Sequence, residues 1–191
     1  MKNGVAIRYT IRRKILTLFG GRFHVYDSDN RLILFSKQKG FRLKEDIRIY
    51  QDESMDQEKL LIRAQKVIDF SAAYDVIDSA QNKKIGALRR RGFQSLARDS
   101  WEFLDANGTA VATLREDSML LALVRRFVSN LVPQRFEARS GDRLLVTYRR
   151  HFNPFVLKLD VEIAPEASGG LDPRLALAAG ILLTAIEGRQ S

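Results

Sequence analysis

Arginine and lysine side chains are the groups in this chain whose type and spacing could do chemistry. Two lysines and three consecutive arginines bracket one short alternating segment, and further arginines follow it: Lys83-Lys84, Arg89-Arg90-Arg91, Arg98 and Arg125-Arg126. A guanidinium group is planar, stays charged and can donate two parallel hydrogen bonds, which suits phosphate better than an ammonium group does. These residues therefore predict recognition of a phosphate-bearing partner.

The arginine run also indicates how the candidate residues are arranged. Successive side chains of a strand point to opposite faces, so Arg89 and Arg91 share a face and Arg90 takes the other. We expect the strand to end before Arg91 and a solvated loop to begin there, which Arg98 and the Arg125-Arg126 pair could approach. The candidate phosphate-binding set is Lys83, Lys84, Arg89, Arg91, Arg98, Arg125 and Arg126.

A purely structural interpretation of these cations stays open. Exposed runs of charge usually solvate a surface, and the arginines could instead pair with the carboxylates of Asp99, Glu102 and Glu116. Two further basic groups allow the same two interpretations: Lys37, Lys39, Arg42 and Lys44 around a glycine turn, and Arg12-Arg13-Lys14 before an apolar stretch.

The chain as a whole carries more positive than negative charge. Its 191 residues include 32 Lys and Arg against 23 Asp and Glu, which gives a net charge of +9. Such a balance favours encounters with nucleic acid or with the anionic face of a membrane. No recognition helix or base-stacking motif accompanies the charge, so nucleic acid is the less expected partner.

Residue patterns typical of catalysis and metal binding are nearly absent. The chain has no cysteine and two histidines, His24 and His151, which by themselves cannot make a metal site. No glycine-rich loop has the spacing of a nucleotide-binding motif, and no serine stands in a nucleophile elbow. We therefore expect a protein without enzymatic activity, cofactor or metal.

Short alternating segments joined by tight turns must position the cations. The turns are rich in Asp, Asn and Gly, which bond to their own backbone or tolerate left-handed geometry. Two cleanly alternating strands, 7–12 and 155–163, flank the hairpins, and we expect Phe155, Leu157 and Leu159 to share the buried face. The five expected hairpins pair 23–26 with 32–35, 41–50 with 59–64, 74–77 with 85–89, 101–104 with 110–115, and 136–139 with 144–149.

The last apolar segment indicates how these strands close. Residues 175–186 are apolar on every side of a helix, so this helix must be wrapped by protein or by lipid. A membrane span takes about 20 residues, so the segment is too short to be transmembrane and wrapping by the chain is favoured. We predict one domain over residues 1–191, mainly β: a twelve-stranded closed antiparallel barrel around a central hydrophobic helix at about 173–187.

Smaller signals concern the helix ends and the start of the chain. Asp172 is a good N-cap, and Pro173 suits the first helical position. A second, amphipathic helix is expected at Met119–Leu131, packed on the end of the barrel. The opening residues are basic and develop no apolar region, so we expect no signal sequence and a cytoplasmic protein.

The series of hairpins and the final helix resemble a known superfamily. The likeness rests on 8–17, 23–39, 74–88, 101–115, 155–163 and 171–187, and its most specific part is Arg22-Phe23-His24-Val25-Tyr26-Asp27 followed by Leu32-Ile33-Leu34-Phe35. The chain resembles the tubby C-terminal-like barrels, which include the LURP-one-related proteins and the phospholipid scramblases. It lacks the cysteine-rich acylation segment of the scramblases and an acidic calcium loop before the last helix, so calcium-dependent lipid movement is not expected.

The resemblance implies binding rather than catalysis. Tubby domains bind phosphoinositides through basic side chains near a helix that interrupts the barrel. The leading hypothesis is therefore peripheral binding of anionic phospholipid head groups by basic loops, in a cytoplasmic protein that reaches the membrane surface. The alternative is a protein-interaction or scaffold domain with a protein partner and no lipid ligand.

Overall fold

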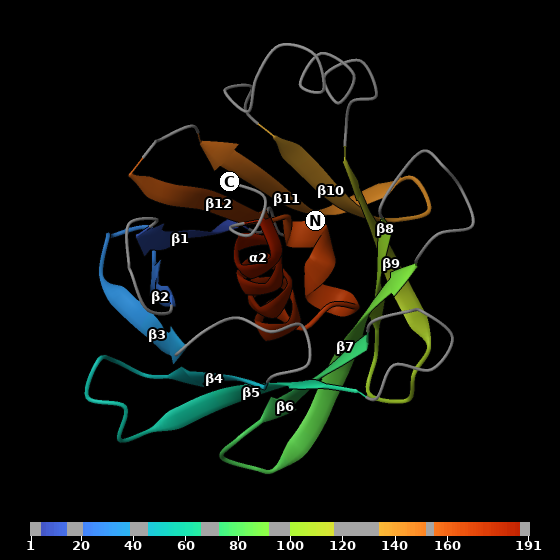
Figure 1. Ribbon diagram of the computed structural model, residues 1–191. Helices are drawn as coiled ribbons and strands as arrows, with labels where there is room; N and C mark the ends of the chain where they lie inside the picture. The colour runs from blue at the N-terminus through green and yellow to red at the C-terminus, as the bar shows by residue number, and fades with distance from the viewer. Residues whose placement is uncertain are drawn as a thin grey trace.

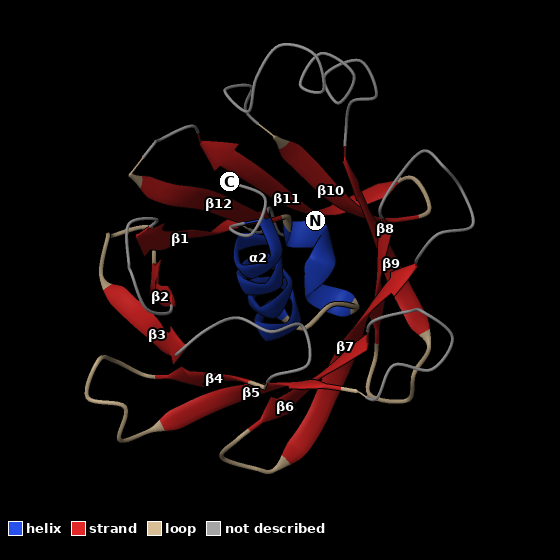
Figure 2. Cartoon of the chain, viewed as in Figure 1, coloured by secondary structure: helices blue, strands red, loops and turns tan. Residues whose placement is uncertain are grey.

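The computed structural model describes residues 5–14, 21–38, 46–65, 73–91, 100–116, 134–151 and 155–187. Strands and a C-terminal helix account for most of them (Figure 2). The elements are β1 (Ile7–Lys14), β2 (Gly21–Tyr26), β3 (Leu32–Gln38), β4 (Ile47–Tyr50), β5 (Glu58–Ala64), β6 (Ala73–Asp78), β7 (Lys83–Arg91), β8 (Ser100–Leu104), β9 (Ala110–Glu116), β10 (Arg135–Ser140), β11 (Arg143–His151), β12 (Val156–Ile163), the 3-10 helix η1 (Pro165–Gly169) and α2 (Pro173–Glu187).

The twelve strands form a closed antiparallel barrel (Figure 1). Each strand pairs with its neighbours in the chain, and β1 pairs with β12 to close the ring. This closing ladder runs from Ile7 opposite Ile163 to Lys14 opposite Val156. The predicted twelve-stranded barrel is confirmed.

The junction of β3 and β4 is the weakest seam of the ring. The two strands meet at one residue pair, Phe35 with Tyr50. A side chain supplements this ladder, because the Ser36 hydroxyl donates a hydrogen bond to the carbonyl oxygen of Arg48 at 2.7 Å. The seam therefore has fewer backbone hydrogen bonds to hold it than the neighbouring ladders have.

Helix α2 fills the barrel. Figure 1 shows it inside the ring of strands, and the apolar residues 175–179 and 181–183 are each at most 8% exposed. Two glycines allow helix and wall to approach closely. A Cβ on Gly180 would lie 2.7 Å from a methyl carbon of Ile11, and one on Gly86 would lie 2.9 Å from a methyl carbon of Leu175. The helix is thus wrapped by protein, as the sequence predicted.

One hydrogen bond caps the start of α2, and another joins the helix to the barrel wall. Asp172 accepts a hydrogen bond from the backbone N–H of Arg174 at 2.9 Å, and Pro173 is the first helical residue. Farther along, the buried Tyr148 hydroxyl donates to the carbonyl oxygen of Ala176 at 2.8 Å. The predicted N-cap is confirmed, and the tyrosine adds a bond between wall and helix.

Alternating strand directions give the barrel two different ends. One end, which we call the turn end, carries the connections 27–31, 51–57, 79–82, 105–109, 141–142 and 164–172. At the other end the odd-numbered strands finish and the even-numbered strands begin. Helix α2 starts at the turn end, where Arg174 contacts Asp78, and runs toward the other end, where Arg13 contacts Thr184.

Residues at the strand ends depart from the expected alternation. Phe155 is 64% exposed rather than buried, because β12 begins one residue later, at Val156. Ile7 is 41% exposed because it is the first residue of β1 and lies at the edge of the barrel. The expected helix at Met119–Leu131 lies outside the described residues.

Candidate anion-binding surface

Arg89 and Arg91 of β7 share one carboxylate on the outer wall of the barrel. Arg89 donates from Nε and Nη2 to Glu102 Oε2 at 2.9 and 2.6 Å, and Arg91 Nε lies 2.5 Å from Glu102 Oε1. The two arginines therefore point to the same face, as strand alternation requires. The expectation that the strand ends before Arg91 is wrong: β7 includes Arg91, which pairs with Ser100 and whose outward side chain is bound by Glu102.

The Glu102 cluster keeps an excess of positive charge. The Glu102 side chain is 6% exposed, whereas those of Arg89 and Arg91 are 43% and 68% exposed. One nearly buried carboxylate thus orients two guanidinium groups that still reach solvent. Pairing with Glu102 was one structural interpretation of these arginines, and the geometry shows this pairing together with remaining exposed donors.

A second cluster of the same kind lies on β10. Arg135 Nη2 is 2.8 Å from Glu137 Oε1, and Arg139 Nη2 is 2.8 Å from Glu137 Oε2. The Glu137 side chain is 10% exposed. Strand β9 lies between the two clusters and places the exposed Arg115 opposite Glu137. The outer wall from β7 to β10 therefore presents two carboxylates that are each bound by two arginines.

The lysines of the predicted set lie at the other end of β7. Lys83 is the first residue of this strand and Arg91 the last, and the rise of a strand separates them by roughly 26 Å. Lys83 is exposed at the turn end, and Lys84 Nζ pairs with Asp75 Oδ1 at 2.6 Å. The structure does not bring lysines and arginines into one patch. The other predicted residues, Arg98, Arg125 and Arg126, lie outside the described part of the chain.

Cations gather at the barrel end opposite the turns. We consider the two residues of each strand that lie nearest this end. The basic residues at these positions form what we call the cationic rim, and Glu116 is the acidic residue at them. Arg48 has the same place in the short β4, but its side chain reaches toward the turn end, where it pairs with Glu58, the first residue of β5, at 2.6 Å, and it is not counted. The cationic rim consists of Arg13, Lys14, Arg22, Lys37, Arg63, Arg90, Arg91, Arg115, Arg135 and Arg150.

Two pairs of cations at or beside the rim face each other across neighbouring strands. Arg22 lies opposite Lys37, and Arg135 lies opposite Arg149. Like charges directly opposite each other destabilise a sheet. Arg22, Lys37 and Arg149 are exposed and form no hydrogen bond or ion pair within the described residues. An anion bound between the two members of such a pair would relieve their repulsion.

Carboxylates dominate the turn end. Asp27 and Asp105 serve turn geometry, because each accepts hydrogen bonds from backbone N–H groups two and four residues later. The connections of the turn end contain one basic residue, Arg31, and the acidic residues Asp27, Asp29, Asp52, Glu53, Asp56, Asp105, Asp142, Glu166 and Asp172. The strand residues nearest this end add the carboxylates of Glu58, Asp78 and Glu162 and the cations Arg8, Lys59, Lys83, Lys84, Arg139 and Arg143. Within the described residues, the turn end therefore stays net negative and the opposite end net positive.

Arg13 carries the positive charge of the rim into the barrel. Its Nη1 donates to the carbonyl oxygen of Thr184 at 3.2 Å, and its guanidinium lies 5.3 Å from the centre of the Phe23 ring. Burial lowers the pKa of Arg13. A cation beside the C-terminal part of a helix interacts favourably with the helix dipole. Arg13 thus stabilises the position of α2 from the rim side.

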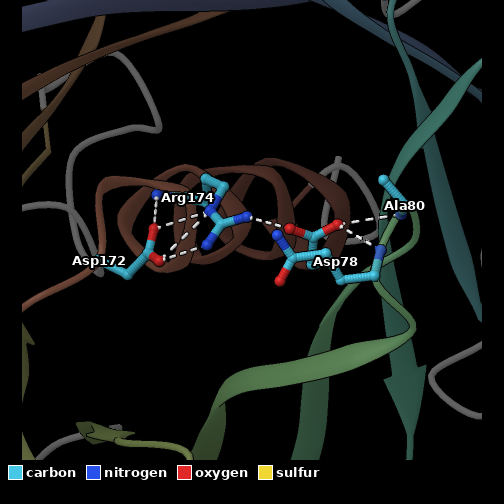
Figure 3. A network of polar contacts seen from close by, with 5 residues as sticks. Asp78, Ala80, Asp172 and Arg174 are labelled. Atoms are coloured by element: carbon cyan, nitrogen blue, oxygen red, sulfur yellow. Dashed lines mark hydrogen bonds and ion pairs between the residues drawn. The ribbon is translucent and has the colours of Figure 1, made fainter.

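An ion-pair network stabilises the start of α2 at the turn end (Figure 3). Arg174 lies between two carboxylates, with Nη1 2.6 Å from Asp78 Oδ2 and Nη2 2.7 Å from Asp172 Oδ2. Asp78 also accepts from the backbone N–H groups of Ala80 and Gln81. The bonds from Gln81 and Arg174 lower the pKa of Asp78. Burial opposes the shift at Asp172, but its bonds from Arg174 lower that pKa as well.

A hollow of about 510 Å³ lies on the outer wall where the β2–β3 turn meets β1, β11 and β12. Its central carboxylate is already bound, because Asp160 accepts from the Thr10 hydroxyl at 2.8 Å and lies 3.4 Å from Lys158 Nζ. Cations and carboxylates balance in its lining, which does not favour an anionic ligand. The charged lining residues are Arg8, Arg149, Lys158, Asp27, Asp160 and Glu162.

The described residues contain no grouping suited to a metal and no long apolar helix. Within the described ranges, no three His, Cys, Asp or Glu side chains come together as a metal site would require. In this same part of the chain, no helix is both long and apolar enough to cross a bilayer.

Comparison with protein families places this barrel. The family model of LURP-one-related proteins matches residues 32–184, which is most of the chain. The chain belongs to the LURP-one-related family. This family is part of the tubby-like C-terminal superfamily, so the resemblance found in the sequence is confirmed at this level. No curated protein and no solved structure matches the chain significantly. In this LURP-one-related barrel, β1 and β2 precede the matched range and still close the ring.

Sequence reasoning found some residues of the rim in this LURP-one-related barrel. Arg91 belongs to the predicted set, Arg90 to the same arginine run, and Arg13, Lys14 and Lys37 to the two further basic groups. Antiparallel pairing offers a signal for the remaining rim residues, because the ends of odd-numbered strands and the starts of even-numbered strands lie at the same end of the barrel. A single basic residue at each of these strand ends predicts a cluster of cations there. The rim residues not singled out are Arg22, Arg63, Arg115, Arg135 and Arg150.

Proposed function

We propose that this LURP-one-related barrel is a non-enzymatic module that binds anionic phospholipid head groups peripherally through its cationic rim. The separation of charge along the barrel axis is the observation that carries the proposal. An anionic surface attracts the rim and repels the acidic turn end, so it selects one orientation of the molecule. The resemblance to tubby domains, which bind phosphoinositides, supports the same class of ligand.

Attraction of several cations to one surface would supply the binding energy. Each Lys or Arg close to an anionic bilayer contributes about 1 kcal/mol. This attraction falls off within a Debye length of about 8 Å at physiological ionic strength. Cations at one end of a barrel can lie within that distance of a flat surface together, whereas cations distributed around its wall cannot.

Individual head groups would be recognised by paired cations. A phosphate between Arg22 and Lys37 would replace their repulsion with two charge-assisted hydrogen bonds. Arg89 and Arg91 are oriented by Glu102, so their exposed N–H groups can meet a phosphate with little loss of side-chain freedom. Both arrangements need a phosphate oxygen and make no use of an acyl chain.

Co-sedimentation of a rim variant with vesicles tests the proposal. The variant combines Arg22→Glu with Arg115→Glu, two exposed cations without an ion pair among the described residues. Loss of two surface cations corresponds to about 2 kcal/mol, or roughly thirtyfold weaker binding, before any repulsion by the new carboxylates. The first change places a carboxylate opposite Lys37, which favours the folded sheet, whereas the second places one opposite Glu137, which disfavours it.

A matched control carries the same change of charge at the turn end. It combines Lys83→Glu with Arg143→Glu, which are also exposed and unpaired within the described ranges. We expect this control to bind vesicles nearly as the unchanged protein does. Lys83 belongs to the sequence-predicted set, so the control also decides between that set and the rim. Equal losses in both variants, or normal binding by the rim variant, would contradict the rim assignment; circular dichroism checks that both are folded.

A further inference from the structure

An exposed aromatic ring lies at the same end of the barrel as the cationic rim. Phe155 directly precedes β12 and is 64% exposed. The other large hydrophobic residues that the described structure leaves exposed are Val5, Ile7 and Met55, and all three lie at the turn end. Among these four residues, Phe155 is therefore the one at the end of the barrel that carries the cationic rim.

The register of β12 explains why this ring is outside the core. Leu157 and Leu159 are buried, and Phe155 continues their alternation by one step. The ladder between β1 and β12 ends at the pair of Lys14 and Val156. Phe155 thus lies beyond the last rung, next to rim positions, where the apolar interior of the barrel no longer covers it.

We propose that Phe155 enters the interfacial layer of an anionic bilayer when the cationic rim docks there. This inference rests on the proposed function and adds a second component to the membrane contact. Aromatic side chains favour the region of the head groups, and a combination of cations with an apolar side chain is typical of segments that lie in the interface. Salt weakens the attraction of the cations but does not screen the burial of the ring.

Tryptophan fluorescence with quenching lipids tests the insertion. Phe155→Trp is compared with Met55→Trp at the turn end, using phosphatidylserine–phosphatidylcholine vesicles with brominated acyl chains. The native Trp101 is 8% exposed and provides a constant background in both proteins. We expect the emission of Phe155→Trp to shift to the blue and to be quenched on binding, while Met55→Trp behaves as the unchanged protein does.

A second variant separates insertion from docking. We expect Phe155→Ala to bind the vesicles about tenfold more weakly, since burial of a phenyl ring is lost, with an unchanged dependence on salt. Salt-dependent vesicle binding without quenching of Phe155→Trp would overturn the insertion and leave the proposed function intact. Equal quenching of both tryptophan variants would overturn the orientation. Absence of binding by the unchanged protein would instead overturn the proposed function itself.

Discussion

Replacing Gly86 with alanine tests how closely α2 packs against β7. A Cβ at this position would lie 2.5 Å from the backbone carbonyl oxygen of Leu104 and 2.9 Å from a methyl carbon of Leu175. The leucine side chain can move, but the carbonyl belongs to the paired strand β8 and cannot move without disturbing the sheet. Overpacking of a core costs about 1–3 kcal/mol, and lower entropy of the unfolded chain returns about 0.4–1 kcal/mol.

The expected net effect of Gly86→Ala is a loss of about 1 kcal/mol in the free energy of unfolding. For a chain of this size, this corresponds to a melting temperature lower by about 2–4 °C. Urea unfolding and thermal melting followed by circular dichroism measure both quantities. Gly170→Ala is the control, because no atom lies within 4 Å of a Cβ there and its φ is −152°. The control should be as stable as the unchanged protein or slightly more stable.

A double-mutant cycle assigns the cost to the helix. If Leu175 contributes to the crowding, Gly86→Ala should cost less in a Leu175→Ala background than in the unchanged protein. The reasoning would be refuted if Gly86→Ala were as stable as Gly170→Ala. That outcome would mean that β7 and α2 are not in the contact on which the wrapped helix depends.

Three other expectations follow from the contacts of the helix and the ring. Asp78 and Asp172 have lowered pKa values, so the stability that they contribute is present above about pH 4 and is lost as the pH falls through their folded-state values. Asp78→Asn should therefore destabilise the protein at pH 7 and flatten the decline of its stability on acidification; urea titrations at several pH values measure this, and parallel declines would contradict it. Tyr148→Phe should cost about 1 kcal/mol, because the hydrogen bond to Ala176 is lost inside the barrel; no change in the urea midpoint would count against this bond. Amide hydrogens at the β3–β4 seam should exchange faster with deuterium than those of the β1–β12 ladder, and mass spectrometry would reveal equal protection if the seam were not weak.

Local signals in the sequence were sufficient for the architecture. Turns such as 105–109, where Asp105 bonds to the following backbone and Gly108 has a φ of +87°, mark where one strand ends and the next begins. The apolar run at the C-terminus has no polar face and begins with the Asp172 cap. These features act over a few residues, so spacing and residue type predict them.

The cationic rim and the exposed ring depend on closure of the barrel. Arg22 and Lys37 share a hairpin, but closure brings Lys14 opposite Val156 from the other end of the chain. Arg91 belongs to β7 because its backbone pairs with that of Ser100 in β8, and sequence spacing alone does not determine this pairing. Strand register decides which cations meet, and it is determined by the whole ring.

The central claim is that the cationic rim docks the protein on anionic lipid. Co-sedimentation of the unchanged protein with neutral and with phosphoinositide-containing vesicles, over a series of salt concentrations, tests it most directly. We expect binding to the anionic vesicles alone, with an affinity that falls steadily as salt rises. Absence of binding to them at low salt would rule out docking through the cationic rim and favour a protein-interaction domain.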